Sequence, residues 1–185
     1  MSNQSEVAIT REQLAKMIDH SMLKPTVTRA DTVEGLQIAQ RYRVAAATVK
    51  PCYTALAAQM LQGSEVLVNT VVGFPHGDET TETKAFETRY LVGQGAQEID
   101  MVLNIGALLG GEYDLVGDDI AAVVQAAGGA TVKVILEIAY LSDELIVRAC
   151  HLCEQAGAHF VKTSTGFAPS GYTIEALKLM RASVS

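Results

Sequence analysis

The sequence predicts an α/β protein in which parallel strands alternate with helices. Short β-branched or apolar segments recur along the chain, and each is followed by a longer, more polar segment with helical spacing. The strand starts expected near residues 44, 66, 97, 131 and 158 lie 22 to 34 residues apart, which is the interval of a βα unit. The 185 residues contain no linker and no low-complexity segment, so we expect a single domain.

The first elements are predicted from helix-start signals. Thr10 is followed three positions later by Gln13, which is the pattern of a capping box, so a short helix is expected before a first strand at 17–20. A longer helix is expected over 28–42, with Thr28 as its N-cap.

The rest of the chain adds five strands, expected at 44–49, 66–72, 97–103, 131–138 and 158–163. With the first strand this gives six parallel strands and six or seven helices. The four prolines all follow an expected strand and precede the next helix: Pro25, Pro51, Pro75 and Pro169. These junctions form the carboxyl end of the sheet, where α/β proteins bind ligands.

Two strands carry charged residues where a parallel strand is normally apolar on both faces. Alternation sends one set to a polar face: Glu98, Asp100, Val102 and Asn104 in one strand, and Lys133, Ile135 and Glu137 in the next. A barrel explains the pattern, because helices cover its outer face while its interior can carry polar, catalytic groups. Interior ion pairs of Lys133 with Glu137 or Glu98, without a catalytic use, are the alternative.

Lys162 ends an apolar strand just before a hydroxyl-rich turn that contains glycine. Burial, or a neighbouring cation such as Lys133, would lower the pKa of this lysine and expose its amine as a nucleophile toward a carbonyl. The protonated imine would stabilise a carbanion without any metal. The turn offers groups for a phosphate or for substrate hydroxyls: Thr163, Ser164, Thr165 and the amides near Gly166. A surface turn without function is the alternative.

Five segments together resemble the deoxyribose-phosphate aldolases, in the order and spacing of that family. They are IDHSMLKP at 18–25, VVGFPHG at 71–77, EIDMVLNIG at 98–106, KVILE at 133–137 and FVKTSTGF at 160–167. The resemblance implies a class I aldolase on a TIM (β/α)8-type barrel. It implies the reversible cleavage of 2-deoxy-D-ribose 5-phosphate to acetaldehyde and D-glyceraldehyde 3-phosphate through a Schiff base, with no cofactor.

The resemblance also implies roles for individual residues. Lys162 matches the Schiff-base lysine, and Asp100 matches the aspartate that moves protons through water during imine formation. Asp19 and Lys133 match polar residues that line the pocket of the family. Thr163 and Thr165, in the turn after the lysine, are expected to contribute to the same substrate pocket.

The resemblance covers about six βα units. The family continues with strands seven and eight, which carry a second catalytic lysine and most of the phosphate site, so we expect 1–185 to be a single aldolase barrel domain without those strands. Two alternatives stay open. One is a partial barrel that binds a sugar phosphate, or associates with itself through its unpaired strand edges, without turnover. The other is a class I aldolase acting on a different phosphorylated sugar.

The amino-acid composition limits the classes of partner that the protein is expected to bind. The chain has 14 Lys and Arg against 21 Asp and Glu, a formal net charge of −7, and no basic cluster, which argues against nucleic acids and anionic membranes. No apolar run approaches the roughly 20 residues that span a bilayer. The N-terminus lacks the order of a secretory signal, so a cytoplasmic protein with free thiols is expected. Small phosphorylated sugars and aldehydes are the expected ligands, with a homo-oligomer as a further possibility.

Other motifs are interpreted as structural. The CxxC pair Cys150 and Cys153 lies inside a helix expected over 143–155, without the second pair that a zinc site needs. Four scattered histidines do not suggest a metal site either. The charged segment 78–89 is expected to be a solvated helix face.

Overall fold

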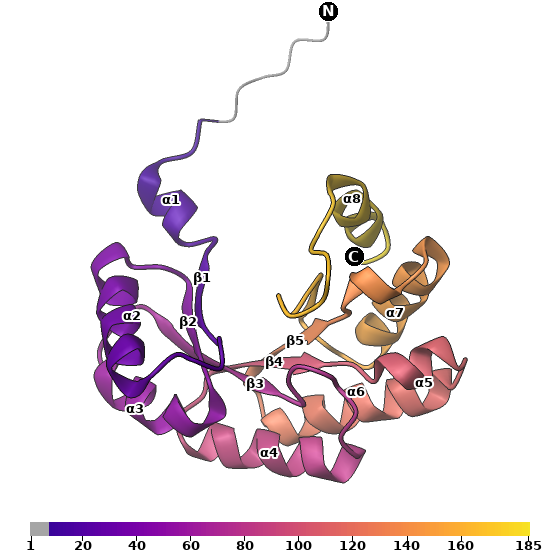
Figure 1. Cartoon of the computed structure of the whole chain (residues 1–185), viewed down its shortest axis with the longest axis horizontal. Helices are drawn as coiled ribbons and strands as arrows, with labels where there is room; N and C mark the ends of the chain where they lie inside the picture. Colours follow the sequence, from indigo (N-terminus) through magenta and orange to yellow (C-terminus); the bar gives the residue numbers. More distant parts are fainter. Residues whose placement is uncertain (1–7) are drawn as a thin grey trace, which may run out of the picture.

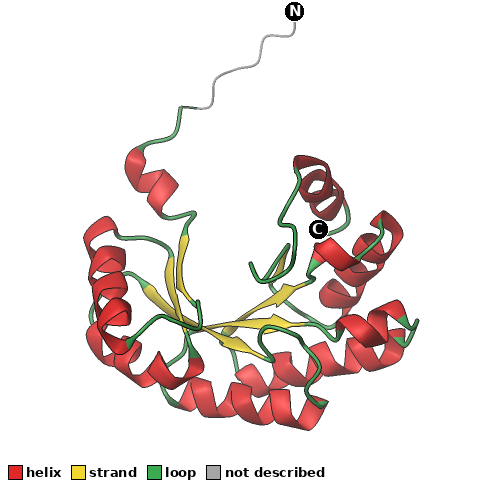
Figure 2. Ribbon diagram, viewed as in Figure 1, coloured by secondary structure: helices red, strands yellow, loops and turns green. Residues whose placement is uncertain are grey.

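In the computed structural model, which describes residues 8–185, six parallel strands form one curled sheet whose order follows the sequence (Figures 1 and 2). The strands are β1 (Asp19–Met22), β2 (Ala46–Val49), β3 (Leu67–Val72), β4 (Glu98–Val102), β5 (Thr131–Ile135) and β6 (Phe160–Lys162). All neighbouring pairs are parallel, as predicted. Within the described residues β1 and β6 are the two edges of the sheet.

The helices follow the convex side of the sheet, and the strands lie inside their arc (Figure 2). The α-helices are α1 (Arg11–Ala15), α2 (Arg29–Tyr42), α3 (Thr54–Met60), α4 (Thr81–Gly93), α5 (Ile105–Leu109), α6 (Tyr113–Ala127), α7 (Asp143–Gln155) and α8 (Ile174–Ala182). Two 3-10 turns, η1 (Pro51–Tyr53) and η2 (Ile138–Tyr140), follow β2 and β5. In residues 8–185 this is one α-helix more than the upper prediction, because Gly110 and Gly111 divide the segment after β4 into α5 and α6.

The predicted helix starts are confirmed. The Thr10 amide donates to Gln13 Oε1 at 2.8 Å while the Gln13 amide donates to Thr10 Oγ1 at 3.1 Å, which completes the capping box of α1. Thr28 caps α2 in the same way with Asp31. The four prolines lie between a strand and the next α-helix, as expected, and Pro51 is the first residue of η1. All six strands differ from their predicted ranges at one end or both, by one to three residues; the largest difference is at β5, which ends at Ile135 because η2 begins at Ile138.

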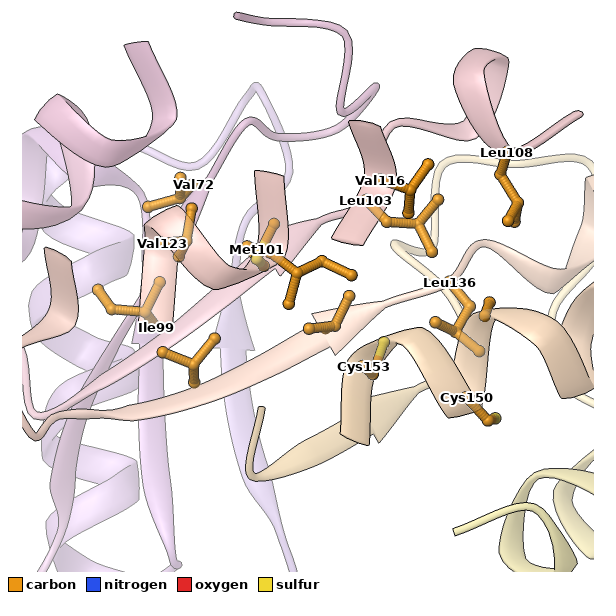
Figure 3. Close-up of a cluster of buried hydrophobic side chains, with 14 of the residues drawn as sticks. Val72, Ile99, Met101, Leu103, Leu108, Val116, Val123, Leu136, Cys150 and Cys153 are labelled. Atoms are coloured by element: carbon orange, nitrogen blue, oxygen red, sulfur yellow. The ribbon is translucent and has the colours of Figure 1, made fainter. Parts of the chain in front are cut away.

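The predicted alternation along β4 determines which of its side chains enter the hydrophobic core. Ile99, Met101 and Leu103 are fully buried and point toward the helix layer, where they lie near Val116 and Val123 of α6 (Figure 3). Their polar neighbours in sequence therefore point to the concave side. A second apolar cluster joins β1, β2 and β3 to α2 and α3. The CxxC cysteines Cys150 and Cys153 are buried in the first cluster on α7, so their structural interpretation is confirmed.

The segment 78–89 is not simply a solvated helix face. Lys84, on α4, is completely buried, and its Nζ donates to Asp119 Oδ2 at 2.6 Å, to the Gly77 carbonyl at 2.7 Å and to the Val102 carbonyl at 3.2 Å. The prediction failed because the partner carboxylate lies on α6, 35 residues further along the chain. Lys84 thus joins α4 and α6 to the β3–α4 loop and to the end of β4.

Candidate active site

The polar residues predicted on β1, β4, β5 and β6 meet on the concave side of the sheet. Asp19 on β1 and Lys133 on β5 are not on neighbouring strands, yet Lys133 Nζ lies 2.8 Å from Asp19 Oδ2. Such a contact is possible only across the interior of the curl. The register explains the rest, because Asp100 lies opposite Lys133 on the adjacent strand and Lys162 is one strand further.

Lys162 lies at the centre of this cluster. Its Nζ donates to Asp100 Oδ2, and to Asp19 Oδ2 at 3.2 Å. The Lys162 side chain is 28% exposed, whereas the Asp100 side chain is only 3% exposed. The lysine is therefore accessible to a small molecule on one side and contacts two carboxylates on the other.

Asn69, on β3, holds Asp100 in place. Asn69 Nδ2 donates to Asp100 Oδ1 at 3.0 Å and to Thr48 Oγ1 at 3.0 Å, and all three side chains are buried. Sequence reasoning missed Asn69 and expected Asn104 to be the amide beside the carboxylates. Asn104 instead caps α5, where its Oδ1 accepts from the Ala107 amide at 3.0 Å. The signal that could have identified Asn69 is an amide side chain within an otherwise largely apolar strand.

Lys133 lies between two carboxylates. Its Nζ is 2.8 Å from Asp19 Oδ2 and 2.6 Å from Glu98 Oε2, so the ion pair with Glu98 that the sequence left open as an alternative is present. Burial alone would lower the pKa of Lys133, but the hydrogen bonds to Asp19 and Glu98 and the charge of Asp100 raise it above its ordinary value. Lys133 is therefore a firmly charged ammonium at neutral pH.

Asp19 bridges the two lysines. Burial alone would raise its pKa, but the hydrogen bond from Lys133 and the charges of Lys133 and Lys162 lower it below its ordinary value. A single oxygen, Asp19 Oδ2, accepts from both ammonium groups. The carboxylate therefore remains ionised between them at neutral pH, and it fixes the distance between the two cations.

The turn after β6 is anchored to the end of β5. The Thr163 carbonyl accepts from the Ile138 amide at 2.9 Å, and the Thr165 amide donates to Glu137 Oε2 at 3.1 Å. Of the two interior ion pairs considered as an alternative, the one between Glu137 and Lys133 does not form, because the Glu137 carboxylate binds Thr165 instead. Thr163 and Thr165 thus lie at the carboxyl end of the sheet beside Lys162, as predicted.

A second loop packs against this turn. Phe167 meets Phe74 of the β3–α4 loop edge to face, with ring centroids 5.5 Å apart. The cavity of about 540 Å3 lined by Arg11, Arg41 and Glu65 lies at the opposite, amino end of the sheet and includes none of the clustered residues. The candidate site is therefore identified by the cluster of charged side chains at the carboxyl ends of the strands, and not by this cavity. No group of three His, Cys, Asp or Glu side chains suited to a metal occurs in residues 8–185.

Known proteins resemble the chain over most of its length. Residues 13–185 match the sequence profile of a family described as DeoC/LacD family aldolase. The deoxyribose-phosphate aldolase of Staphylococcus epidermidis (strain ATCC 12228) is 51% identical over 170 residues, which cover 92% of this chain and 77% of the relative. That of Bacillus mycoides is 51% identical over 172 residues, with the same coverage.

Solved structures agree. A putative deoxyribose-phosphate aldolase from Coccidioides immitis superposes with a TM-score of 0.92 at 39% identity, covering 95% of this chain and 70% of the other. The deoxyribose phosphate aldolase from Aeropyrum pernix gives a TM-score of 0.86 at 30% identity, covering 94% and 73%. These likenesses confirm the predicted barrel-type fold, of which this chain forms a six-stranded, curled part.

Proposed function

Because the chain belongs to the DeoC/LacD family of aldolases, we propose that it cleaves 2-deoxy-D-ribose 5-phosphate to acetaldehyde and D-glyceraldehyde 3-phosphate through a Schiff base on Lys162. Relatives named deoxyribose-phosphate aldolase at 51% identity support the substrate. The observation that carries the chemistry is the contact between a partly exposed lysine and a buried aspartate, Asp100. A lysine beside a proton acceptor has what an imine-forming nucleophile needs.

The first half of the reaction is the formation of the imine. Asp100 accepts a proton from the Lys162 ammonium, and the free amine attacks the C1 aldehyde of the open-chain sugar. The proton then returns, through water, to the hydroxyl of the carbinolamine, which leaves as water and gives the iminium. Asn69 binds Asp100 Oδ1 and so leaves Oδ2 facing the lysine for both transfers.

The second half is carbon–carbon cleavage. The proton of the C3 hydroxyl is removed through water to Asp100 as the C2–C3 bond breaks. The bonding electrons move into the iminium, which becomes an enamine, and D-glyceraldehyde 3-phosphate leaves. Protonation of the enamine carbon and hydrolysis of the resulting iminium then release acetaldehyde and restore Lys162.

Asp19 and Lys133 support this cycle without forming bonds to substrate. Lys133 holds Asp19 at 2.8 Å, and Asp19 in turn contacts Lys162 at 3.2 Å, so the pair orients the lysine toward the concave side. When Lys162 becomes neutral, the Lys133 ammonium remains to balance the local carboxylates. Thr163 and Thr165 belong to the wall that meets the sugar.

The proposal includes a cytoplasmic location and small-molecule partners. Free cysteines fit a reducing compartment. In residues 8–185 no helix is both long and apolar enough to cross a membrane. Self-association is part of the proposal because β1 and β6 are the two edges of the sheet in residues 8–185, and the Aeropyrum pernix relative is described as a tetramer. Size-exclusion chromatography with light scattering tests the assembly.

The test of the proposed function is the release of both products from 2-deoxy-D-ribose 5-phosphate. We expect acetaldehyde and D-glyceraldehyde 3-phosphate in equal amounts from the unaltered chain and none above background from Lys162→Met. Glu65→Gln, which changes an exposed carboxylate at the other end of the sheet, is the matched control and should keep full activity. Cleavage of another phosphorylated sugar, with no acetaldehyde from this one, would contradict the assigned substrate.

A further inference from the structure

Glu137 is a buried carboxylate that the proposed reaction does not use. It follows β5, is 2% exposed and has a φ of +52°, a left-handed backbone conformation that is uncommon for residues other than glycine. Its Oε2 accepts hydrogen bonds from the Thr165 amide, at 3.1 Å, and from the Thr165 hydroxyl. No salt bridge to Glu137 occurs in the described part of the chain, so Thr165 is its hydrogen-bonding partner there.

These contacts fix the direction of hydrogen bonding at the Thr165 hydroxyl. A hydroxyl has one proton and two lone pairs. The Phe167 amide can only donate, and it donates to Thr165 Oγ1 at 3.1 Å, which uses one lone pair. The hydroxyl proton of Thr165 is donated to Glu137 Oε2. One lone pair of Thr165 Oγ1 remains for a ligand.

A hydroxyl in this state can recognise only a hydrogen-bond donor. The oxygens of a phosphate ester dianion accept hydrogen bonds and carry no proton, whereas a sugar hydroxyl donates one. We propose that Glu137 is a positioning residue that makes Thr165 a hydrogen-bond acceptor for a hydroxyl of the sugar. Glu137 would thereby make the site prefer phosphorylated ligands that carry hydroxyl groups over phosphorylated ligands that carry none. This proposal rests on the proposed function, which supplies the identity of the sugar phosphate.

The turn has other anchors that keep it folded when Glu137 changes. The Thr163 carbonyl accepts from Ile138, and Phe167 packs against Phe74. Loss of the carboxylate is therefore expected to free the Thr165 proton without releasing the whole turn. In that state Thr165 could donate to a phosphate, and the selection for a sugar hydroxyl would weaken.

The test is equilibrium binding of two ligands that cannot form an imine. One is 2-deoxy-D-ribitol 5-phosphate, which has the hydroxyls of the sugar but no aldehyde, and the other is pentyl phosphate, which has no hydroxyl. The measured quantity is the ratio of the two dissociation constants, by calorimetry on the full chain. We expect the unaltered protein to prefer the ribitol phosphate, and Glu137→Met and Thr165→Val each to reduce that preference about tenfold, the size of one hydrogen bond.

Two conservative variants separate positioning from a structural role. In Glu137→Gln the carboxamide oxygen can still accept from Thr165, and Thr165→Ser keeps the hydroxyl, so both should retain most of the preference. Three results would overturn the proposal: an unchanged ratio of dissociation constants in Glu137→Met, an equal loss of affinity for both ligands, or no preference in the unaltered protein. If the preference and its loss are observed but no imine forms at Lys162, only the proposed function fails.

Discussion

Replacing Lys84 by Met tests how the loop beside the active site is held. The change removes an ammonium that donates to Asp119 at 2.6 Å and to the carbonyls of Gly77 and Val102 at 2.7 and 3.2 Å. The side chains of Lys84 and Asp119 are 0% and 3% exposed, so water cannot replace the lost bonds. Asp119 would remain as a buried, unpaired carboxylate.

The expected loss of stability follows from that burial. Removing one partner of a buried ion pair destabilises a protein by about 3–5 kcal/mol. For a domain of this size each 1 kcal/mol lowers Tm by about 2–4 °C, so Lys84→Met should melt roughly 6–20 °C below the unaltered chain. The double change Lys84→Met with Asp119→Leu removes the stranded charge as well and should recover a large part of the loss.

Urea unfolding and thermal melting, both followed by circular dichroism, measure these differences. Lys178→Met is the matched control, because Lys178 is exposed on α8 and its loss should change the free energy of unfolding by no more than about 0.5 kcal/mol. A single variant within about 1 kcal/mol of the unaltered chain would refute the reasoning. So would a double variant that is as unstable as the single one.

Three other predictions follow from the site and the core. Asp100→Leu should abolish product release while the circular dichroism spectrum stays unchanged, and turnover at the original rate would remove Asp100 from the mechanism. The lowered pKa of Asp19 contributes stability that is present above about pH 4 and is lost as the pH falls through the lower pKa that Asp19 has in the folded state. Asp19→Asn should therefore reduce the fall of the free energy of unfolding at acid pH, measured by urea unfolding across a pH series. Burial raises the pKa of Cys150 to about 11, so an aromatic disulfide reagent at pH 7 should modify the exposed Cys52 rapidly and the two α7 thiols only after unfolding; rapid modification of all three would contradict their burial.

Local patterns were enough to predict the six strands and the charged residues that meet on the concave side of the sheet. The period-two alternation around Asp100 indicated one polar and one apolar face, and the structure has the apolar side chains in the core. Lys162 stood out because a charged residue ends an apolar strand. The capping pattern at Thr28 predicted the start of α2. Each of these signals lies within a few residues of the feature that it predicts.

Contacts between distant segments could not be predicted in this way. The partner of Lys84 lies 35 residues away on another helix, and Asn69 lies 31 residues before Asp100, so both contacts depend on strand register and helix packing. The left-handed backbone at Glu137, which breaks the alternation of β5 and directs the carboxylate to Thr165, has no local sequence signal such as glycine. Sequence reasoning could therefore offer only Lys133 as a partner for Glu137, as one of two alternative ion pairs.

The central claim is that Lys162 forms the Schiff base, and reductive trapping tests it most directly. Borohydride added with 2-deoxy-D-ribose 5-phosphate should leave a stable adduct, and peptide mass spectrometry should locate it on Lys162. The neighbouring Lys133, which shares Asp19 Oδ2 with Lys162, is the internal competitor. The account predicts an adduct on Lys162 that disappears in Lys162→Met; an adduct on Lys133, or none on either lysine, would contradict it.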